Sequence, residues 1–567
     1  MKSWLPLLIA LCGHLSAAPV FLENFDRTPE GWSWSDHFRW EAQGGMEDSG
    51  VLTAVRESAE KPLFASKKIT LEHNVIYRLT IHYRTEMKPT PKYKVQEIFS
   101  LRFFRNGQPA DGVFSMRTEP GSRLEWDLFT SEFSLPGESD DEVLLTLLLR
   151  TGREGQIWYD NILLEEVRRI PAPELRGEAY LTHGGIGCAT VNFVTSSPMT
   201  AAVDYRIAGE EKWHRRFNLL GGQARIDQSV QSIRLTELRP GVRYEYRVVL
   251  KPIPETQAEF YSPVRSFFSF PKEESRFSVF YTSDTQTSNK NRKRLFQNFI
   301  KFFQADQADL IVHGGDIDSL FDKPSEDIFL DSFIHVLNRG PQSRFFVPVR
   351  GNHEYRGSCS ADFFKYLSGG ENRSYYAFTY GQAFFIVLDT GETTGRIPHL
   401  KNYCRNYGGQ QLIAEQRKFL QKTVKSEAFK NAKFRVVLAH APLINNHFMT
   451  RTIDGIAKGI LYGTENPPKI HLWLAGHTHY YSRPSADGGQ MGFPDAKKLD
   501  LVQDLPFVTV VNDGPGGGGP DFTGMKLDFS EDAITIYSFD DSGRIFDNFA
   551  IDLQGNIKEL KSELVKK

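Results

Sequence analysis

The sequence predicts a multidomain protein in which two N-terminal all-β sandwiches precede an α/β layered domain. The chain has 567 residues, which is too long for one ordinary hydrophobic core. Short apolar runs separated by Gly, Pro, Asn and Asp clusters fill its first half, and this pattern is typical of strands and turns. From Arg276 onward apolar strands alternate with helical patterns, which is typical of an α/β domain.

The composition is that of a globular protein with little net charge. Hydrophobic residues make up 40% of the chain and charged residues 24%. The 68 Lys and Arg residues nearly balance the 70 Asp and Glu residues, which gives a net charge of −2. Such a balance offers no basic surface for nucleic acid or for an anionic membrane, so neither is indicated as a partner.

Residues 1–18 have the form of a secretory signal peptide. Lys2 is followed by a short apolar run from Trp4 to Cys12, and small residues precede Pro19. The run is far shorter than the roughly 20 residues that span a bilayer, and no later segment approaches that length. The segment therefore predicts a secreted or periplasmic protein without a transmembrane segment, although a buried N-terminal strand is the alternative.

Residues 19–168 are expected to form the first sandwich. Alternating runs at 75–83 and 143–149 predict strands, and the run 155–164 resembles the closing strand of jelly-roll modules of the carbohydrate-binding kind. Trp32, Trp34 and Trp40 either form a flat platform for sugar rings or fill the core of the sandwich. A carbohydrate partner for this module is therefore a hypothesis that the sequence leaves open.

Two further domains are expected after the linker at Pro171 and Pro173. The segment 169–272 resembles a fibronectin type III domain in its run 235–249, where a Pro-Gly turn leads into a strand with paired tyrosines. The segment 273–567 carries the α/β pattern, with helices expected over 292–303 and 410–425.

Three cysteines follow the predicted signal peptide. Cys359 and Cys404 lie in loop-like sequence, and an exported chain meets an oxidising compartment, so a disulfide between them is one of two open outcomes. Cys188 is expected to be a buried strand thiol.

Polar residues end five apolar strands of the third domain. They are Asp284 with Gln286, Asp316, Asn352 with His353, His440, and His477 with His479. Ligands of an open α/β sheet collect at the carboxyl ends of its strands, so these side chains are expected to share one crevice. Asp, Asn and His are residues that hold divalent cations. Gly476 is expected to bend the backbone so that the two following histidines converge.

The ordered set Asp-x-Gln, Gly-Asp, Gly-Asn-His-Glu, His and Gly-His-x-His resembles the calcineurin-like metallophosphoesterase superfamily. With a fibronectin-like segment ahead of it, the set resembles the purple acid phosphatase branch. The resemblance implies two divalent or mixed-valence metal ions (Fe, Mn or Zn) bridged by Asp316. One ion would also take Asp284 and His479, and the other Asn352, His440 and His477.

The same resemblance implies the activity. It is hydrolysis of phosphate monoesters, or of diesters, by attack of a metal-bound hydroxide. His353 would face the substrate or merely hydrogen-bond to Asp316 or Glu354, and His447 is either a substrate-side histidine or a surface one. Asp318 and His313 are expected to support the ligands rather than to bind metal.

Two positions depart from the purple enzymes, and a third departs from the wider superfamily. Ser319 stands where their iron-binding tyrosine would be, and Ala441 where many of them carry a second histidine. Gln286 replaces a histidine of the wider superfamily, so its amide oxygen would either bind metal or only position water. These changes favour a divalent pair over an Fe(III)-tyrosinate.

Two questions remain open at the level of sequence. The run Gly514–Pro520 is either a flexible loop or a wall beside the site. The protein could also be a polysaccharide- or surface-binding protein whose metallophosphoesterase domain is catalytically idle. The six proposed ligands argue against an idle domain, because such a domain has no physical need for clustered imidazoles and carboxylates.

Overall fold

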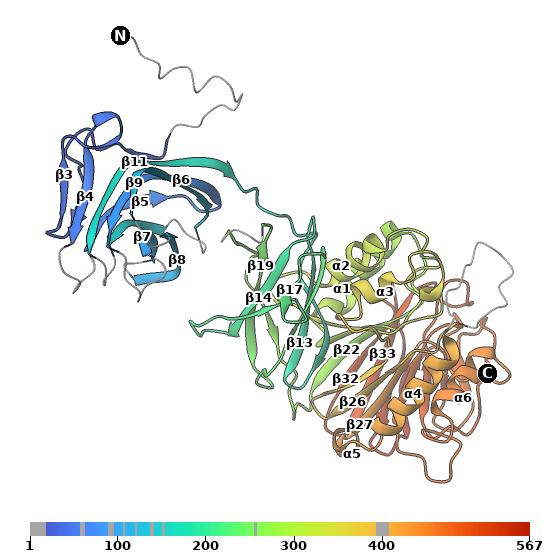
Figure 1. The fold of residues 1–567 in the computed structure, drawn as a ribbon. Helices are drawn as coiled ribbons and strands as arrows, with labels where there is room; N and C mark the ends of the chain where they lie inside the picture. Colours follow the sequence, from blue (N-terminus) through green and yellow to red (C-terminus); the bar gives the residue numbers. More distant parts are fainter. Residues whose placement is uncertain are drawn as a thin grey trace. The chain divides into compact units, whose positions relative to one another are not determined.

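A computed structural model describes residues 19–56, 63–88, 96–105, 108–118, 122–135, 141–149, 154–253, 258–392 and 408–567 of the chain (Figure 1). The chain divides into two compact units. The first comprises the residues up to Pro173 together with Val249–Tyr261, and the second comprises Glu174–Val248 and Ser262–Lys567. The division after Pro173 falls in the predicted linker. The predicted signal peptide and Cys404 lie outside the described residues, so export and the disulfide stay predictions.

The first unit is a sandwich of two antiparallel sheets. One sheet has the strand order β3 (Phe38–Glu41), β4 (Val51–Arg56), β11 (Gly155–Arg169), β6 (Val75–Met87) and β9 (Arg123–Phe133), with β1 (Phe21–Glu23) paired to β11. The other has the order β2 (Trp32–Trp34), β5 (Leu63–Leu71), β10 (Asp141–Leu149), β7 (Gln96–Arg105) and β8 (Gln108–Thr118). Alternate residues of β6 are buried, as expected for a strand with one face on the core.

The tryptophans of this sandwich are not arranged as a sugar platform at the predicted place. The indoles of Trp32 and Trp40 pack against the core, and the Trp40 Nε1–H donates to the carbonyl of Phe25 at 2.7 Å. Trp34 is exposed, and the three rings therefore do not form one open surface. Of the two interpretations of Trp32, Trp34 and Trp40, the structure supports packing against the core for Trp32 and Trp40, because covering part of a large indole is more favourable than leaving it in water.

The fibronectin-like segment is built from two sheets, as predicted. One contains β12 (Tyr180–Gly185), β13 (Cys188–Val194) and β18 (Val230–Leu235), and the other β14 (Thr200–Ile207), β15 (His214–Phe217), β19 (Arg243–Lys251), β20 (Phe260–Tyr261) and β21 (Arg265–Phe268). The first of these sheets does not stop at the predicted domain limit. β12 pairs in parallel with β24 (Phe345–Pro348) of the α/β segment, Leu181 opposite Phe345.

The α/β segment is a sandwich of two sheets. The pairing of β12 and β24 produces one ten-stranded sheet in the order β18-β13-β12-β24-β23-β22-β32-β33-β34-β35, where β22 is Phe277–Thr282, β23 Leu310–His313, β32 Thr523–Phe529, β33 Ala533–Asp540, β34 Ile545–Asp552 and β35 Ile557–Ser562. The second sheet has the order β25 (Tyr376–Tyr380), β26 (Ala383–Leu388), β27 (Phe434–Ala439), β28 (Leu472–Ala475) and β31 (Val508–Val511). A small third sheet contains β29 (Arg483–Pro484), β30 (Gln490–Gly492) and β36 (Val565–Lys566).

Aromatic side chains join the two large sheets. The rings of Phe277 and Phe529 from the ten-stranded sheet stack with centroids 4.3 Å apart, and Phe529 lies 5.8 Å from Phe434 and 5.9 Å from Phe385 of the other sheet. Such ring contacts add to the free energy of burying the apolar surface. The two sheets are thereby held face to face.

Helices cover the outer faces of these two sheets (Figure 1). α1 (Asn289–Phe303), the helical segment η3 (Asp327–Ile334) and α2 (His335–Leu337) share a core with β22 and β23, and α3 (Asp362–Tyr366) adds to it. α4 (Gly409–Thr423), α5 (Glu427–Asn431) and α6 (Phe448–Ala457) pack on β26, β27 and β28. α1 and α4 match the two helices predicted from the sequence. No helix within the described ranges is long and apolar enough to cross a membrane.

Candidate metal centre

The six predicted ligands come from both sheets of the α/β sandwich. Asp284, Asp316 and Asn352 follow β22, β23 and β24 of the ten-stranded sheet. His440 follows β27, while His477 and His479 follow β28, and both strands belong to the five-stranded sheet. In each sheet these strands run parallel to one another, so their carboxyl ends lie at one edge. The face-to-face packing of the sheets brings the two edges together.

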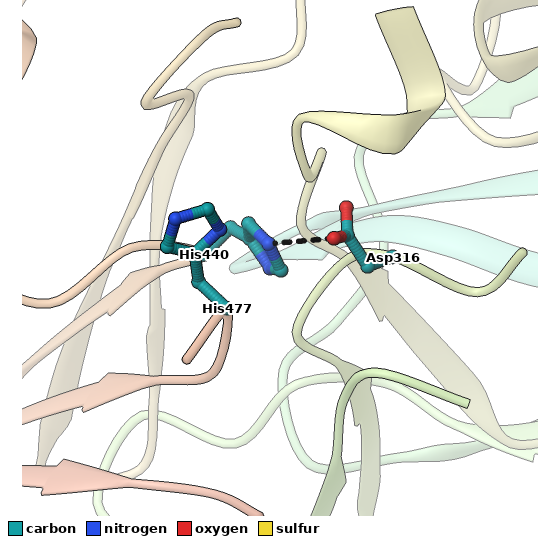
Figure 2. Close-up of side chains that lie close together, drawn as sticks. All are labelled: Asp316, His440 and His477. Carbon is teal, nitrogen blue, oxygen red and sulfur yellow. Dashed lines mark ion pairs between the residues drawn. The ribbon is translucent and has the colours of Figure 1, made fainter. Parts of the chain in front are cut away.

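Four of these side chains meet at contact distance. The His440 Nε2 atom lies 3.1 Å from the Asp316 Oδ2 atom and 3.1 Å from the Asn352 Oδ1 atom. The His477 Nδ1 atom lies 2.8 Å from the same Asn352 oxygen. Figure 2 shows Asp316, His440 and His477 side by side, with the ion pair of His440 and Asp316 dashed. Asp316, Asn352 and His440 are buried and His477 is half-buried.

Asp284 and His479 form the adjoining half of the cluster. The His479 Nε2 atom lies 3.5 Å from the Asp284 Oδ1 atom. The Asp284 carboxylate also accepts the backbone N–H of His477 at 3.0 Å, which ties this half to the first. The Ser283 hydroxyl donates to Asp284 Oδ2 at 2.6 Å. The two histidines after β28 therefore serve different halves of the cluster, as the resemblance implied.

Four of the six residues have left-handed backbone. The φ angles are +56° at Asp284, +56° at Asp316, +72° at His477 and +60° at His479. Asp and His tolerate this region better than most residues, but each instance costs about 1 kcal/mol or more. The predicted role of Gly476 as the bend is therefore corrected, because the histidines themselves make the bends.

Gly476 is required for another reason. A Cβ atom at this position would lie 2.0 Å from Asp284 Oδ2, so any other residue would displace that carboxylate. The glycine-rich run is likewise packed against the site. A Cβ atom at Gly514 would lie 2.9 Å from the Cβ atom of Asp284, and the carbonyl of Pro515 contacts His479. Of the two interpretations of Gly514–Pro520, the structure supports a wall beside the site.

Backbone carbonyls fix the tautomers of two imidazoles. The His440 Nδ1–H donates to the carbonyl of Gly314 at 2.9 Å, and the His479 Nδ1–H donates to the carbonyl of Pro515 at 2.8 Å. In each ring the Nε2 atom thereby faces a carboxylate, Asp316 in one case and Asp284 in the other. This arrangement is typical of histidines that bind metal.

Two carboxylates that the motifs did not assign hold the ligands in place. Glu354 accepts the backbone N–H groups of Gly351, Asp316 and Ile317 at 2.9, 3.0 and 2.9 Å. Glu392 accepts the Nδ2–H of Asn352 at 3.3 Å, which turns the amide oxygen toward the histidines. Glu354 was visible in the Gly-Asn-His-Glu motif, but Glu392 lies far along the chain and no sequence signal marked it.

The remaining candidates lie around this cluster. Gln286 donates from Nε2 to Asp316 Oδ2 at 3.2 Å, so its nitrogen faces the site and the geometry favours a hydrogen-bond donor over a ligand. His353 lies with Nε2 3.6 Å from Asp316 Oδ2, and the ring of His447 lies 5.3 Å from that of His477. Asp318 pairs with Arg292 at 2.7 Å and His313 contacts Thr285 at 3.0 Å, as expected for supporting residues.

The cluster fits divalent cations. Neighbouring ligand atoms of a cation bound at about 2.1 Å lie roughly 3 Å apart, close to the separations among Asp316, Asn352, His440 and His477. Carboxylate, amide oxygen and imidazole suit Zn, Mn and Fe. Asn352 adds an oxygen without charge, so two cations would leave the site net positive. Asp284, Asp316, Asn352, His440, His477 and His479 are the residues that would hold them.

The pKa values of the three histidines reflect the negative charge of Asp284 and Asp316. Burial lowers the pKa of His440, but the Asp316 carboxylate outweighs burial and raises it to about 10. Burial also lowers the pKa of His479, and the hydrogen bond to Asp284 raises it to about 9. Burial and the neighbouring His440 lower the pKa of His477 to about 3. Two imidazoles thus bind protons tightly where a cation would otherwise sit.

Replacing Gly476 by Ala should weaken metal binding. The added methyl group occupies the place of the Asp284 carboxylate, so we expect affinity for Mn²⁺ to fall about 10- to 100-fold. Isothermal titration calorimetry measures this affinity. The matched control is Gly408→Ala, because nothing lies within 4 Å of a Cβ atom there. Equal affinities of the two variants would contradict the placement of Asp284.

Cation binding should release protons. With pKa values of about 10 and about 9, His440 and His479 are protonated at pH 7.5 in the metal-free protein. Each must lose its proton before its ring nitrogen can bind a cation, so affinity for Mn²⁺ should rise with pH up to about pH 10, the pKa of His440. Calorimetry in buffers of different ionisation enthalpy counts the released protons. We expect the release of about two protons per chain. If no protons are released, these imidazoles are not ligands.

Comparisons with known proteins address the same segment. The family model of the calcineurin-like phosphoesterases matches residues 277–481, which contain all six predicted ligands. A search of curated proteins found no match.

Several solved structures are similar to the chain at low identity. A purple acid phosphatase from yellow lupin (Lupinus luteus) seeds is 13% identical over 87% of this chain and 93% of its own, with a TM-score of 0.46. PhoD is 11% identical over 68% of this chain and 92% of its own, with a TM-score of 0.44. A xylan-binding domain from Paenibacillus barcinonensis is 12% identical over 27% of this chain and 98% of its own, with a TM-score of 0.21.

The assignment therefore rests on the family model and on the sequence motifs that it covers. Residues 277–481 of the chain form a calcineurin-like phosphoesterase domain.

Proposed function

We propose that this domain hydrolyses phosphate esters, monoesters ahead of diesters, with two divalent cations. The observation that carries the proposal is the convergence of two carboxylates, one amide oxygen and three imidazoles from the strand ends of two sheets. The left-handed backbone at four of these residues supports it, because strained conformations persist where a site demands them.

Each group of the chain has a defined task in this proposal. The Asp316 carboxylate would be shared by both cations, Asp284 and His479 would complete one site, and Asn352, His440 and His477 the other. The cations would supply Lewis acidity, lowering the pKa of water and neutralising charge on the phosphate oxygens. Gln286 and the backbone N–H of His353 donate to Asp316 and hold its carboxylate in one orientation.

His353 is placed to handle a proton on the substrate side. Its Nδ1–H donates to the carbonyl of Ser319 at 2.7 Å, which leaves Nε2 facing the cluster. The side chain is 21% exposed, whereas that of Asp316 is 1% exposed, so His353 lies on the open side of the site. Protonation of the leaving oxygen from such a position contributes about 10²- to 10⁴-fold in rate. His447, beside His477, lines the same region.

Replacing Asp316 by Asn should abolish turnover. The variant removes the charge that both cations would share, so hydrolysis of p-nitrophenyl phosphate should fall by more than about 100-fold, the upper loss for residues that merely support a ligand. Bound metal, about two ions per chain in the parent protein, should fall with it. Asp528→Asn, at a half-exposed position on β32, is the control.

Two outcomes would overturn the proposal. Turnover by protein freed of metal with a chelator would exclude a metal-dependent reaction. Bound metal without turnover of any monoester or diester would instead favour a binding protein with an idle domain.

A second activity, carbohydrate binding, is proposed for the first unit on a different observation. The Arg84 guanidinium lies 4.5 Å from the ring centroid of Trp158 and 5.2 Å from that of Trp126. Arg84 and Trp158 are opposite each other on β6 and β11, on the face turned away from the core. Half-exposed indoles beside a hydrogen-bond donor suit a sugar, whose faces are apolar and whose edges are polar.

Replacing Trp126 and Trp158 by Ala in the full chain should test this activity. We expect retention on insoluble polysaccharides such as xylan and cellulose to be lost, because both stacking surfaces disappear. The control is Trp34→Ala, which removes an exposed indole from the other sheet of the same sandwich. No retention of the parent protein, or equal retention of all three proteins, would remove carbohydrate as a partner.

A further inference from the structure

Arg356 lies at the open side of the metal centre, three residues after His353. Its Nη1 atom lies 2.7 Å from the His353 Nε2 atom and 3.1 Å from the Nδ1 atom. The side chain of Arg356 is 15% exposed, similar to that of His353 at 21%, while the ligands Asp316 and His440 are at 1% and 0%. One imidazole ring therefore separates the guanidinium from the ligand cluster.

A buried carboxylate holds the guanidinium in this place. Glu392, whose side chain is 3% exposed, accepts hydrogen bonds from the Arg356 Nε and Nη2 atoms at 2.8 and 2.7 Å. The same Glu392 oxygen accepts the Nδ2–H of Asn352 at 3.3 Å. Glu392 thus positions both Arg356 and the candidate ligand Asn352. Two of the three guanidinium nitrogens of Arg356, Nε and Nη2, already have a hydrogen-bond partner.

The third nitrogen, Nη1, is the one turned toward the substrate side. The Nδ1–H of His353 donates to the Ser319 carbonyl, and the Arg356 Nη1 atom lies close to both ring nitrogens. Nη1 therefore contacts the ring of His353 and leaves the in-plane side of its Nε2 atom facing the cluster. A phosphate oxygen is a stronger acceptor for a guanidinium than an imidazole ring. A bound phosphate would therefore replace His353 as the partner of Nη1. The other arginine of the motif cannot serve, because Arg350 is buried with its guanidinium 3.5 Å from the ring of Tyr355.

We propose that Arg356 binds a terminal oxygen of the substrate phosphate and makes the site selective for monoesters over diesters. The proposal rests on the phosphoesterase function proposed above and names the residue that causes its preference for monoesters. A monoester near neutral pH carries up to two charges and three terminal oxygens, whereas a diester carries one charge and two. Two cations and Arg356 are three partners for the terminal oxygens of the phosphate. A monoester has one terminal oxygen for each partner, whereas a diester has one too few. Glu392 acts as the positioning residue.

The test compares Arg356→Gln and Arg356→Lys with the parent protein. For Gln, kcat/KM for p-nitrophenyl phosphate should fall about 10- to 100-fold, the loss typical of a charged hydrogen bond, while that for bis(p-nitrophenyl) phosphate should change less than about threefold. Lys keeps the positive charge but lacks the planar guanidinium, so kcat/KM of Arg356→Lys for p-nitrophenyl phosphate should lie between those of the parent protein and Arg356→Gln. Bound metal should not change. The control is Arg373→Gln, because Arg373 forms an exposed ion pair with Glu371.

Binding of inorganic phosphate to the Mn²⁺-loaded protein gives a readout that needs no turnover. Calorimetry should show affinity falling about 10- to 100-fold in Arg356→Gln and unchanged in Arg373→Gln. Equal losses for monoester and diester, or no loss for either, would overturn the proposal. If the parent protein hydrolyses neither ester, the proposed function fails, and phosphate binding decides the role of Arg356 by itself: unchanged affinity refutes it and weakened affinity supports it.

Discussion

The Asp316 carboxylate is the group on which the rest of the site depends. It contacts His440, accepts from Gln286 and from the backbone of His353, and lies in a left-handed turn whose own N–H is held by Glu354. A buried carboxylate surrounded by imidazoles is stable only when charge is compensated, by protons or by cations. The residues around Asp316 place the compensating positive charge next to its carboxylate.

The scaffold explains why the site is both precise and strained. Ligands from two sheets can meet only if the sheets pack rigidly, and stacked rings such as Phe277 and Phe529 provide that rigidity. The ten-stranded sheet extends through β24 into β12, so the fibronectin-like strands and the strands that carry the candidate metal centre form one continuous sheet. Movement of β24, which carries Asn352 at its end, is therefore restrained on both sides.

Local patterns predicted much of this, because they depend on residues close in sequence. The strand-end motifs predicted the six residues that the structure brings together, and amphipathic periodicity predicted α1 and α4. Two features depended on long-range packing and were not predictable: the pairing of β12 with β24, and the role of Glu392 forty residues from Asn352. Gly476 shows an intermediate case, since its necessity was predicted but its reason, the proximity of Asp284, required coordinates.

The central claim is that Asp284, Asp316, Asn352, His440, His477 and His479 together hold two cations with Asp316 shared between them. Anomalous diffraction from crystals grown with Mn²⁺ would locate the ions directly. The account predicts two peaks, one beside Asp284 and His479, one among Asn352, His440 and His477, and both bound to Asp316. A single peak, or two peaks of which one does not contact Asp316, would contradict it.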